Sequence, residues 1–138
     1  MAAISFFEKP GCINNTRQKK LLALAGHTLQ VHNLLDYPWR AEELRRYFGD
    51  LPVAQWFNPS APAVKAGQVT PEAVTEHEAL ELMLQDPLLI RRPLMQVGEE
   101  CRVGFDIDTV HQWIGLDLRE AGTGTRQDLE TCPQQRET

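Results

Sequence analysis

The stretch that decides the fold is Ile4-Ser5-Phe6-Phe7, followed by Lys9-Pro10-Gly11-Cys12-Ile13-Asn14-Asn15-Thr16-Arg17. The apolar run predicts a buried strand over residues 2–7, and the Pro-Gly pair predicts a tight turn. A helix is expected from about 14 to 25, stopped by Gly26 and followed by an alternating strand around 29–31. This order predicts a strand–helix–strand unit with a right-handed crossover and a cysteine at the start of its helix.

Cys12 is the strongest candidate for a chemical role. A thiol at the start of a helix meets unpaired backbone N–H groups and the positive end of the helix dipole. Both favour the thiolate, which is the nucleophilic form of cysteine. Arg17, one turn further along, would add positive charge. The alternative is an inert thiol that packs as a small hydrophobic group. We expect the activated thiol, with Cys12 alkylated faster than Cys132 at neutral pH.

Composition sets the outer limits of function. The chain has 138 residues and a formal net charge of -5, which fits one domain and argues against direct nucleic-acid binding. Three cysteines are too few for a disulfide framework, and the four histidines show no metal-ligand spacing. No signal peptide or membrane-spanning stretch is evident. We therefore expect a cytoplasmic protein with no membrane contact and no metal.

The middle of the chain predicts helices separated by prolines. A helix over 40–48 would bury Leu44, Tyr47 and Phe48, and residues 51–67 are expected to form short turns anchored by Trp56 and Phe57. A helix-start signal follows at Thr70-Pro71-Glu72. The capping box Thr75-Glu76-His77-Glu78 then opens a helix to about Gln85, with a predicted buried stripe of Leu80, Met83 and Leu84.

The last third predicts a hairpin and a helix. Residues 94–97 and 101–105 are apolar runs around Gly98-Glu99-Glu100, and Asp106 can cap a helix that buries Ile107, Val110 and Ile114. The whole order predicts an α/β fold with a thioredoxin-like mixed sheet: β-α-β, a helical insertion, then a β-hairpin and a helix. We assign residues 1–116 to this domain, the insertion to about 36–88, and 117–138 to a disordered tail.

Two signatures resemble a known family. Pro10-Gly11-Cys12 with Arg17, and Leu88-Leu89-Ile90-Arg91-Arg92-Pro93-Leu94, together resemble the arsenate reductase family with its Spx-type relatives. Residues 56–62 and 103–106 resemble the branch called nitrogenase-associated proteins, whose name implies genomic company with nitrogen fixation. The resemblance implies that Cys12 is a nucleophile that attacks arsenate, that glutathione and glutaredoxin complete the reduction, and that no cofactor is bound.

The resemblance also implies an oxyanion site that this chain keeps only in part. Family members typically hold the oxyanion with three arginines, of which Arg92 matches one. Asn58 stands near the second position, and Gly104 and Phe105 stand at the third. Because charged hydrogen bonds contribute about 1.5–3 kcal/mol each, we expect weak arsenate reduction. Thioredoxin-like folds imply a cis proline facing the cysteine, and we expect it at Pro93.

Two functions therefore stay open. The first is a monothiol oxidoreductase of the arsenate reductase type, with Cys12 as nucleophile, Arg92, Arg17 and Asn58 at the anion, and Pro93 shaping the pocket. Glutathione or glutaredoxin would be its redox partner. The second is a catalytically degenerate member that acts as a protein-interaction or regulatory module and binds a protein partner. Since Asn15 occupies the place of a second cysteine, a Cys-x-x-Cys dithiol is absent. In both cases we expect a monomer.

Overall fold

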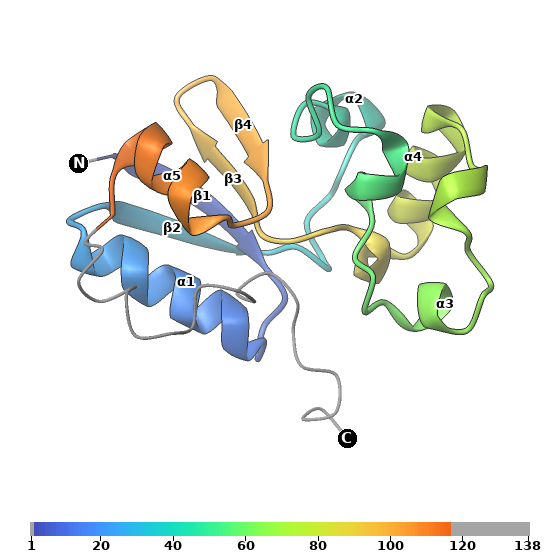
Figure 1. The fold of residues 1–138 in the computed structure, drawn as a ribbon, viewed down its shortest axis with the longest axis horizontal. Coiled ribbons are helices and arrows are strands. Elements are labelled where there is room, and N and C mark those ends of the chain that lie inside the picture. Colours follow the sequence, from blue (N-terminus) through green and yellow to red (C-terminus); the bar gives the residue numbers. More distant parts are fainter. Residues whose placement is uncertain (1, 117–138) are drawn as a thin grey trace.

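A four-stranded mixed sheet organises the protein, whose computed structural model describes residues 2–116 (Figure 1). Its order is β2-β1-β3-β4, formed by β1 (Ala3–Glu8), β2 (Thr28–Asn33), β3 (Leu94–Val97) and β4 (Glu100–Val103). β1 and β2 are parallel, whereas β3 runs antiparallel to both β1 and β4. The predicted parallel half and antiparallel hairpin are confirmed. The predicted tail, 117–138, lies outside the described residues.

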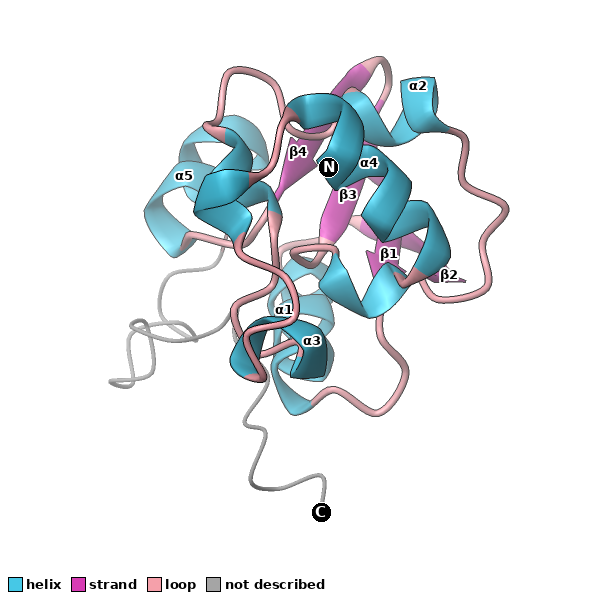
Figure 2. Ribbon diagram, turned by 90° about the vertical axis from the view of Figure 1, so that its right-hand side faces the viewer, coloured by secondary structure: helices cyan, strands magenta, loops and turns pink. Residues whose placement is uncertain are grey.

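The two faces of the sheet are buried by different parts of the chain. Ile4 and Phe6 on β1 pack with α1 (Ile13–Leu24) and α5 (Ile107–Ile114), while Phe7 points to the other face, where the helical insertion lies. This follows from the alternation of side chains along a strand. Figure 2 looks onto the insertion, with α2, α3 and α4 in front of the strands. The sheet therefore separates two hydrophobic clusters.

The insertion is built from short helical pieces, as the prolines predicted. It contains α2 (Ala41–Arg45), α3 (Pro62–Lys65), α4 (Glu76–Gln85) and 3₁₀ turns at Val53–Trp56, Pro71–Ala73 and Pro87–Leu89. The predicted helix over 40–48 was too long. The backbone N–H groups of Tyr47 and Phe48 bond to residues three positions earlier, so the chain tightens into turns after α2. Tyr47 and Phe48 are nevertheless buried, as expected.

Some of the predicted helix starts and buried residues of the insertion are confirmed, and others are not. Thr75 forms the expected capping box with Glu78 at the start of α4, but the signal at Thr70 yields only one 3₁₀ turn. Met83 is fully buried, whereas Leu84 is exposed. Ala79 takes its place in the core, because residues four apart share a helix face. Trp56 and Phe57 are packing anchors, and the Trp56 ring stacks on Phe48 at 4.6 Å between centroids.

A buried histidine ties the ends of the domain together. The backbone N–H of Ala2 donates to Nδ1 of His27 at 2.9 Å, so the proton lies on Nε2, which donates to the carbonyl of Gly115 at 2.8 Å. His27 precedes β2, and Gly115 follows α5. One imidazole thus joins the start of β1, the start of β2 and the end of α5. No helix within residues 2–116 is long and apolar enough to cross a membrane.

Candidate thiol and anion site

The turn after β1 places Cys12 at the start of α1. The Cys12 N–H donates to the carbonyl of Lys9 at 3.1 Å, which closes the predicted turn. Gly11 lies within it at φ +83°, a conformation that costs other residues roughly 1–2 kcal/mol. Cys12 is the N-cap residue of α1 and is 1% exposed. The predicted position of this thiol at a helix N-terminus is therefore observed, and the thiol is enclosed by protein.

Polar side chains on α1 hold this turn, and sequence reasoning missed them. Asn15 Oδ1 accepts a hydrogen bond from the Lys9 backbone at 3.1 Å, and Asn15 Nδ2 donates to Gln18 Oε1 at 2.8 Å. Asn14, Asn15 and Gln18 are all buried on the face that continues to Leu21 and Leu22. Their helical spacing was the available signal. Leu24 is exposed, because these polar residues shift the buried face around the helix.

The sheet register brings the second signature to the same end of the sheet as Cys12. Phe7 pairs with Leu94 in the antiparallel β1–β3 ladder, so the residues that follow β1 and those that precede β3 leave the sheet together. Arg92 and Pro93 immediately precede β3, and the peptide bond between them is cis, as predicted. Gly104 joins them, since its N–H donates to the carbonyl of Pro93 at 2.9 Å.

Arg92 is a buried cation, and one nitrogen of its guanidinium lacks a partner among the described residues. The residue is 3% exposed, and its Nε lies buried with no hydrogen-bond acceptor among the described residues. A buried guanidinium is costly unless an acceptor or an anion compensates for its lost hydration. The side chain is therefore ready to receive hydrogen-bond acceptors from a ligand, and its planar fork of N–H donors suits oxyanions and carboxylates.

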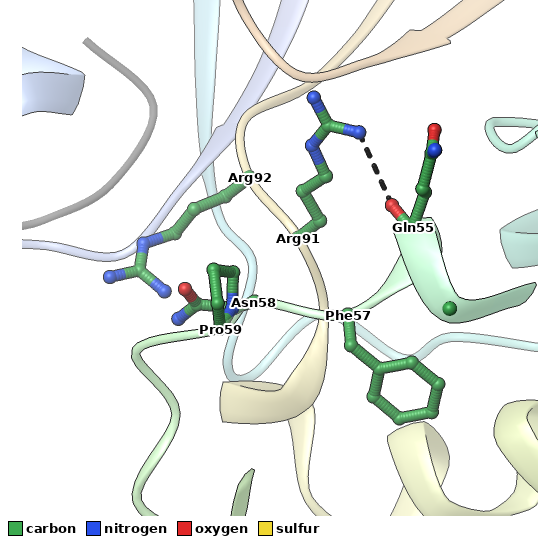
Figure 3. A pocket seen from close by; sticks show the side chains of 7 residues that line it. Gln55, Phe57, Asn58, Pro59, Arg91 and Arg92 are labelled. Carbon is green, nitrogen blue, oxygen red and sulfur yellow. Dashed lines mark hydrogen bonds between the residues drawn. The ribbon is translucent and has the colours of Figure 1, made fainter. Parts of the chain in front are cut away.

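Asn58 and Arg92 line the same cavity, which has a volume of about 260 Å³ (Figure 3). Asn58 is held by its backbone, whose N–H donates to the carbonyl of Leu89 at 2.8 Å, and its Oδ1 accepts from the N–H of Ser60 at 3.0 Å. Arg91 turns in the opposite direction from Arg92 (Figure 3) and donates through Nη1 to the carbonyl of Gln55 at 3.2 Å. The cavity thus holds a polar amide where the resemblance led us to look for an arginine.

The predicted site residues are partly assembled. Arg92 and Asn58 share the cavity. Pro93, which follows Arg92 in the sequence, is also buried. Cys12 is not among the residues that line this cavity, and its direct contact with Arg92 stays a prediction. Arg17 lies exposed on α1, so its role at the anion also stays a prediction. Gly104 and Phe105 are buried and supply no positive charge at the third arginine position.

A second cysteine lies away from this site. Cys101 is half-buried on β4, and burial raises its pKa above the usual value, while Arg46 and a hydrogen bond from Tyr47 act in the opposite direction. Burial likewise raises the pKa of Tyr47, and the neighbouring Cys101 adds to this. Both groups are therefore neutral near pH 7, and Cys101 is a poorer nucleophile than an exposed thiol.

The arrangement suits thiol chemistry with an anionic partner. A cysteine at a helix N-terminus and a buried arginine, whose Nε has no partner within residues 2–116, lie at the same end of one sheet. The helix N-terminus places the positive end of its dipole beside the sulfur, and the guanidinium favours a negatively charged reactant. Within residues 2–116, no three His, Cys, Asp or Glu side chains gather to hold a metal ion. The described residues therefore offer a thiol and a guanidinium as the reactive groups.

Comparisons with known proteins agree with this layout. The ArsC family model matches residues 11–113. An uncharacterized 15.7 kDa protein in the draG 3′ region of Rhodospirillum rubrum is 58% identical and covers 98% of this chain and 91% of its own length. The global transcriptional regulator Spx of Streptococcus pyogenes is 20% identical, over 85% of this chain and 89% of its own.

Solved structures show the same fold. An ArsC family related protein from Bacteroides fragilis superposes with a TM-score of 0.71 at 24% identity, covering 80% of this chain and 97% of its own. The arsenate reductase from Vibrio cholerae gives a TM-score of 0.64 at 22% identity, over 75% and 90% of the two chains. The family match over residues 11–113 and the relative at 58% identity decide the family, and the superposition decides the fold. The chain belongs to the ArsC family and has its thioredoxin-like fold.

Proposed function

We propose that the protein is a monothiol oxidoreductase of the arsenate reductase type, with Cys12 as its nucleophile and glutathione as its redox partner. The observation that carries this proposal is the buried guanidinium of Arg92, whose Nε has no partner among the described residues, at the end of the sheet where Cys12 begins α1. A partnerless buried cation is destabilising on its own, and glutathione carries carboxylates that would pair with it.

The proposed step is a thiol–disulfide exchange. The Cys12 thiolate attacks the glutathione sulfur of a mixed disulfide between glutathione and another thiol, a Cys12–glutathione disulfide forms, and the other thiol leaves as its thiolate. A free glutathione thiolate then attacks the glutathione sulfur bound to Cys12, which forms glutathione disulfide and regenerates the Cys12 thiolate; a glutaredoxin thiolate would take the glutathione in the same way. In these steps Arg92 would orient a carboxylate and Pro93 would shape the contact surface. No resident cofactor is required, because the reacting sulfurs and electrons come from the two thiols.

Arsenate is a less favoured substrate in this proposal. The family relatives include a protein named arsenate reductase, but Asn58 provides an amide at one arginine position, and Gly104 and Phe105 provide no charge at the other. Two lost charged contacts would weaken oxyanion binding by roughly 3–6 kcal/mol in total. A thiol partner of the size of glutathione relies less on these contacts, since it brings several polar groups.

The cellular setting is part of the proposal. The Rhodospirillum rubrum relative is named for its place in the draG 3′ region. The proposed association with nitrogen fixation rests on the resemblance of residues 56–62 and 103–106 to the nitrogenase-associated branch. A cytoplasmic location is proposed because reduced thiols persist there.

A second candidate is a protein-interaction or regulatory module that keeps the fold without catalysis. Asn58 at the cavity favours it, because the amide replaces a charge that family chemistry uses. The Spx relative, described as a global transcriptional regulator, supports this second candidate.

Glutathione disulfide provides the test. The reduced full-length chain is incubated with it at neutral pH, and the modified cysteine is identified by peptide mass spectrometry. The expected result is one glutathione on Cys12, removable by glutaredoxin with glutathione, and absent in a Cys12→Ser variant. Modification confined to Cys101 and Cys132 would reject Cys12 as the nucleophile and leave the interaction module as the better account.

A further inference from the structure

The side-chain amide of Asn58 has a fixed orientation in the cavity that it shares with Arg92. Its Oδ1 accepts a hydrogen bond from the backbone N–H of Ser60 at 3.0 Å. Because a backbone N–H can only donate, the atom that faces Ser60 must be the oxygen, and Nδ2 occupies the other branch of the amide. The backbone of Asn58 is also held, since its N–H donates to the carbonyl of Leu89 at 2.8 Å. The group that Asn58 can present to a ligand is therefore an N–H donor.

Arg92 adds charged donors beside this amide. Figure 3 shows the Arg92 guanidinium next to the Asn58 amide, with the ring of Pro59 alongside. Asn58 and Arg92 are both buried, and Nε of Arg92 has no acceptor among residues 2–116. Buried donors of this kind gain most from a ligand that supplies acceptors, because burial has removed the water that would otherwise bond to them. We refer to Asn58 and Arg92 together as the clamp.

The charge around the clamp suits an anion with a single negative charge. Arg91 and Arg92 line the cavity, and none of its described lining residues is acidic. Arg91 turns away from the clamp and donates to the carbonyl of Gln55, so one guanidinium stands at the clamp itself. It neutralises one negative charge, and the amide of Asn58 adds donors without adding charge. A dianion would keep one negative charge buried and uncompensated, which is costly.

A carboxylate therefore fits the clamp better than a tetrahedral dianion such as arsenate or phosphate. Its two oxygens share one charge and lie in one plane, which matches the planar fork of a guanidinium. One oxygen can accept from Arg92 while the other accepts from Nδ2 of Asn58. The cavity of about 260 Å³ is smaller than the roughly 300–1,000 Å³ of sites that enclose a whole ligand, so it suits one end of a larger molecule.

Glutathione has two carboxylates, and the lining of the cavity distinguishes them. The glutamyl carboxylate shares its carbon atom with an ammonium group, whereas the glycine carboxylate has no cation beside it. An ammonium group in this cavity would be repelled by Arg92 and would meet no acidic side chain among the described lining residues. The glycine end of glutathione is therefore the better match.

We propose that Asn58 and Arg92 form a carboxylate clamp that binds the glycine end of glutathione. The choice of glutathione rests on the proposed function, and the clamp adds to it a specificity-determining residue, Asn58. The resemblance implies an arginine near this position, and two guanidiniums would suit a dianion. The amide of Asn58 shifts the preference of the cavity from a doubly charged oxyanion to a singly charged carboxylate.

Calorimetric titration of S-methylglutathione into a full-length Cys12→Ser chain tests the clamp without any covalent step. Two analogues carry an amide in place of either the glycine carboxylate or the glutamyl α-carboxylate. The glycine amide should bind at least tenfold more weakly than S-methylglutathione, as expected for the loss of one charged contact, whereas the glutamyl amide should bind within about threefold. As competitors, acetylglycine should displace S-methylglutathione at a lower concentration than inorganic phosphate does.

An Asn58→Asp variant reverses the chemistry of the second donor. It keeps an oxygen for the Ser60 N–H and places an acidic oxygen where Nδ2 was. The affinity for S-methylglutathione should fall at least tenfold, and the glycine amide should then bind about as well as S-methylglutathione. Gln68→Glu makes the same change of charge at an exposed residue and should alter the affinity by less than about twofold.

The clamp is overturned if S-methylglutathione does not bind saturably, if the two amides bind alike, or if phosphate competes better than acetylglycine. It is equally overturned if Asn58→Asp weakens binding no more than Gln68→Glu does. The amide comparison needs no change at Asn58, so it decides the question even if Asn58→Asp fails to fold. Glutathionylation of Cys12 is measured separately in the unmutated chain. Modified Cys12 without the expected binding would reject the clamp alone, and the expected binding without modification would reject the proposed function alone.

Discussion

At the scale of single residues, the protein combines a buried thiol with a buried cation that nothing in residues 2–116 neutralises. The sequence pointed to Cys12 through its place at a helix start and to Arg92 through the family resemblance, and their chemical roles stay predictions. The side chains that hold the Cys12 turn were not foreseen. Asn15 supports the turn through a bond to Lys9, and this contact depends on a helix face that apolar periodicity alone assigns poorly.

The amide of Asn58 sets the expected weakness toward arsenate. An Asn58→Arg variant would place a second guanidinium in the cavity with Arg92. Oxyanion affinity should rise by about ten- to 150-fold, the equivalent of one charged contact, while thermal stability without anion should fall because two cations then share a buried site. Arsenate binding by calorimetry, compared with Asn58→Gln as the uncharged control, checks this. Equal arsenate affinity in the two variants would contradict the role given to Asn58.

Cys101 should react with alkylating reagents only at raised pH. Burial disfavours its thiolate, and Arg46 partly restores it. The pH midpoint of alkylation should therefore lie above the ordinary cysteine value of about 8.5. Arg46→Gln removes a lowering influence, so it should move the midpoint further up, whereas Arg40→Gln should not move it. Site-resolved mass spectrometry across pH gives both midpoints. A downward shift in Arg46→Gln would show that the sign is wrong.

At the scale of elements, the most reliable sequence signals for helix starts were those in which a side chain bonds to the nearby backbone. The Thr75 capping box and the Asp106 cap were predicted and are present, because each needs residues within one turn. The helix expected over 40–48 ended early, and Leu84 is exposed, because the packing of the insertion decides where its short helices stop. A sequence pattern of a few residues cannot predict these contacts, because they join residues that are far apart in the chain.

The capping box of α4 permits a matched test of this point. Thr75→Ala removes the bond accepted from the Glu78 N–H at 3.1 Å and should lower the free energy of unfolding by about 1 kcal/mol. Thr70 also precedes a helical turn but makes no side-chain cap bond, so Thr70→Ala should cost only a few tenths of a kcal/mol. Urea unfolding of both variants is the measurement. Equal losses would mean that the cap contributes nothing specific.

At the scale of the whole molecule, the order of elements predicted the architecture, because a parallel β-α-β unit followed by an antiparallel hairpin leaves few sheet arrangements. The sheet order β2-β1-β3-β4 and the insertion on one face follow that expectation. The buried tie through His27 was not foreseen, since it joins Ala2 to Gly115 and no local pattern marks the pairing.

His27 should matter to the stability of the entire domain. His27→Ala leaves the Ala2 N–H and the Gly115 carbonyl without their partner, and the free energy of unfolding should fall by about 1–3 kcal/mol. His77 is the control, because its side chain is 83% exposed and its Nε2 lies 3.5 Å from the Glu81 carboxylate. His77→Ala should stay within about 0.5 kcal/mol of the parent. Equal free energies of unfolding for the two variants, measured by chemical unfolding, would contradict the stabilising role given to His27.

The central claim is that Cys12 reacts within the positive field of Arg92, and two reagents of similar size test it directly. Iodoacetate is an anion and iodoacetamide is neutral, so the ratio of their rate constants at one cysteine reports local charge and cancels differences in access. We predict a higher ratio at Cys12 than at Cys132 of the same chain. In Arg92→Leu the Cys12 ratio should fall to the Cys132 value. A Cys12 ratio that matches Cys132 in the parent, or that survives Arg92→Leu, would contradict the account.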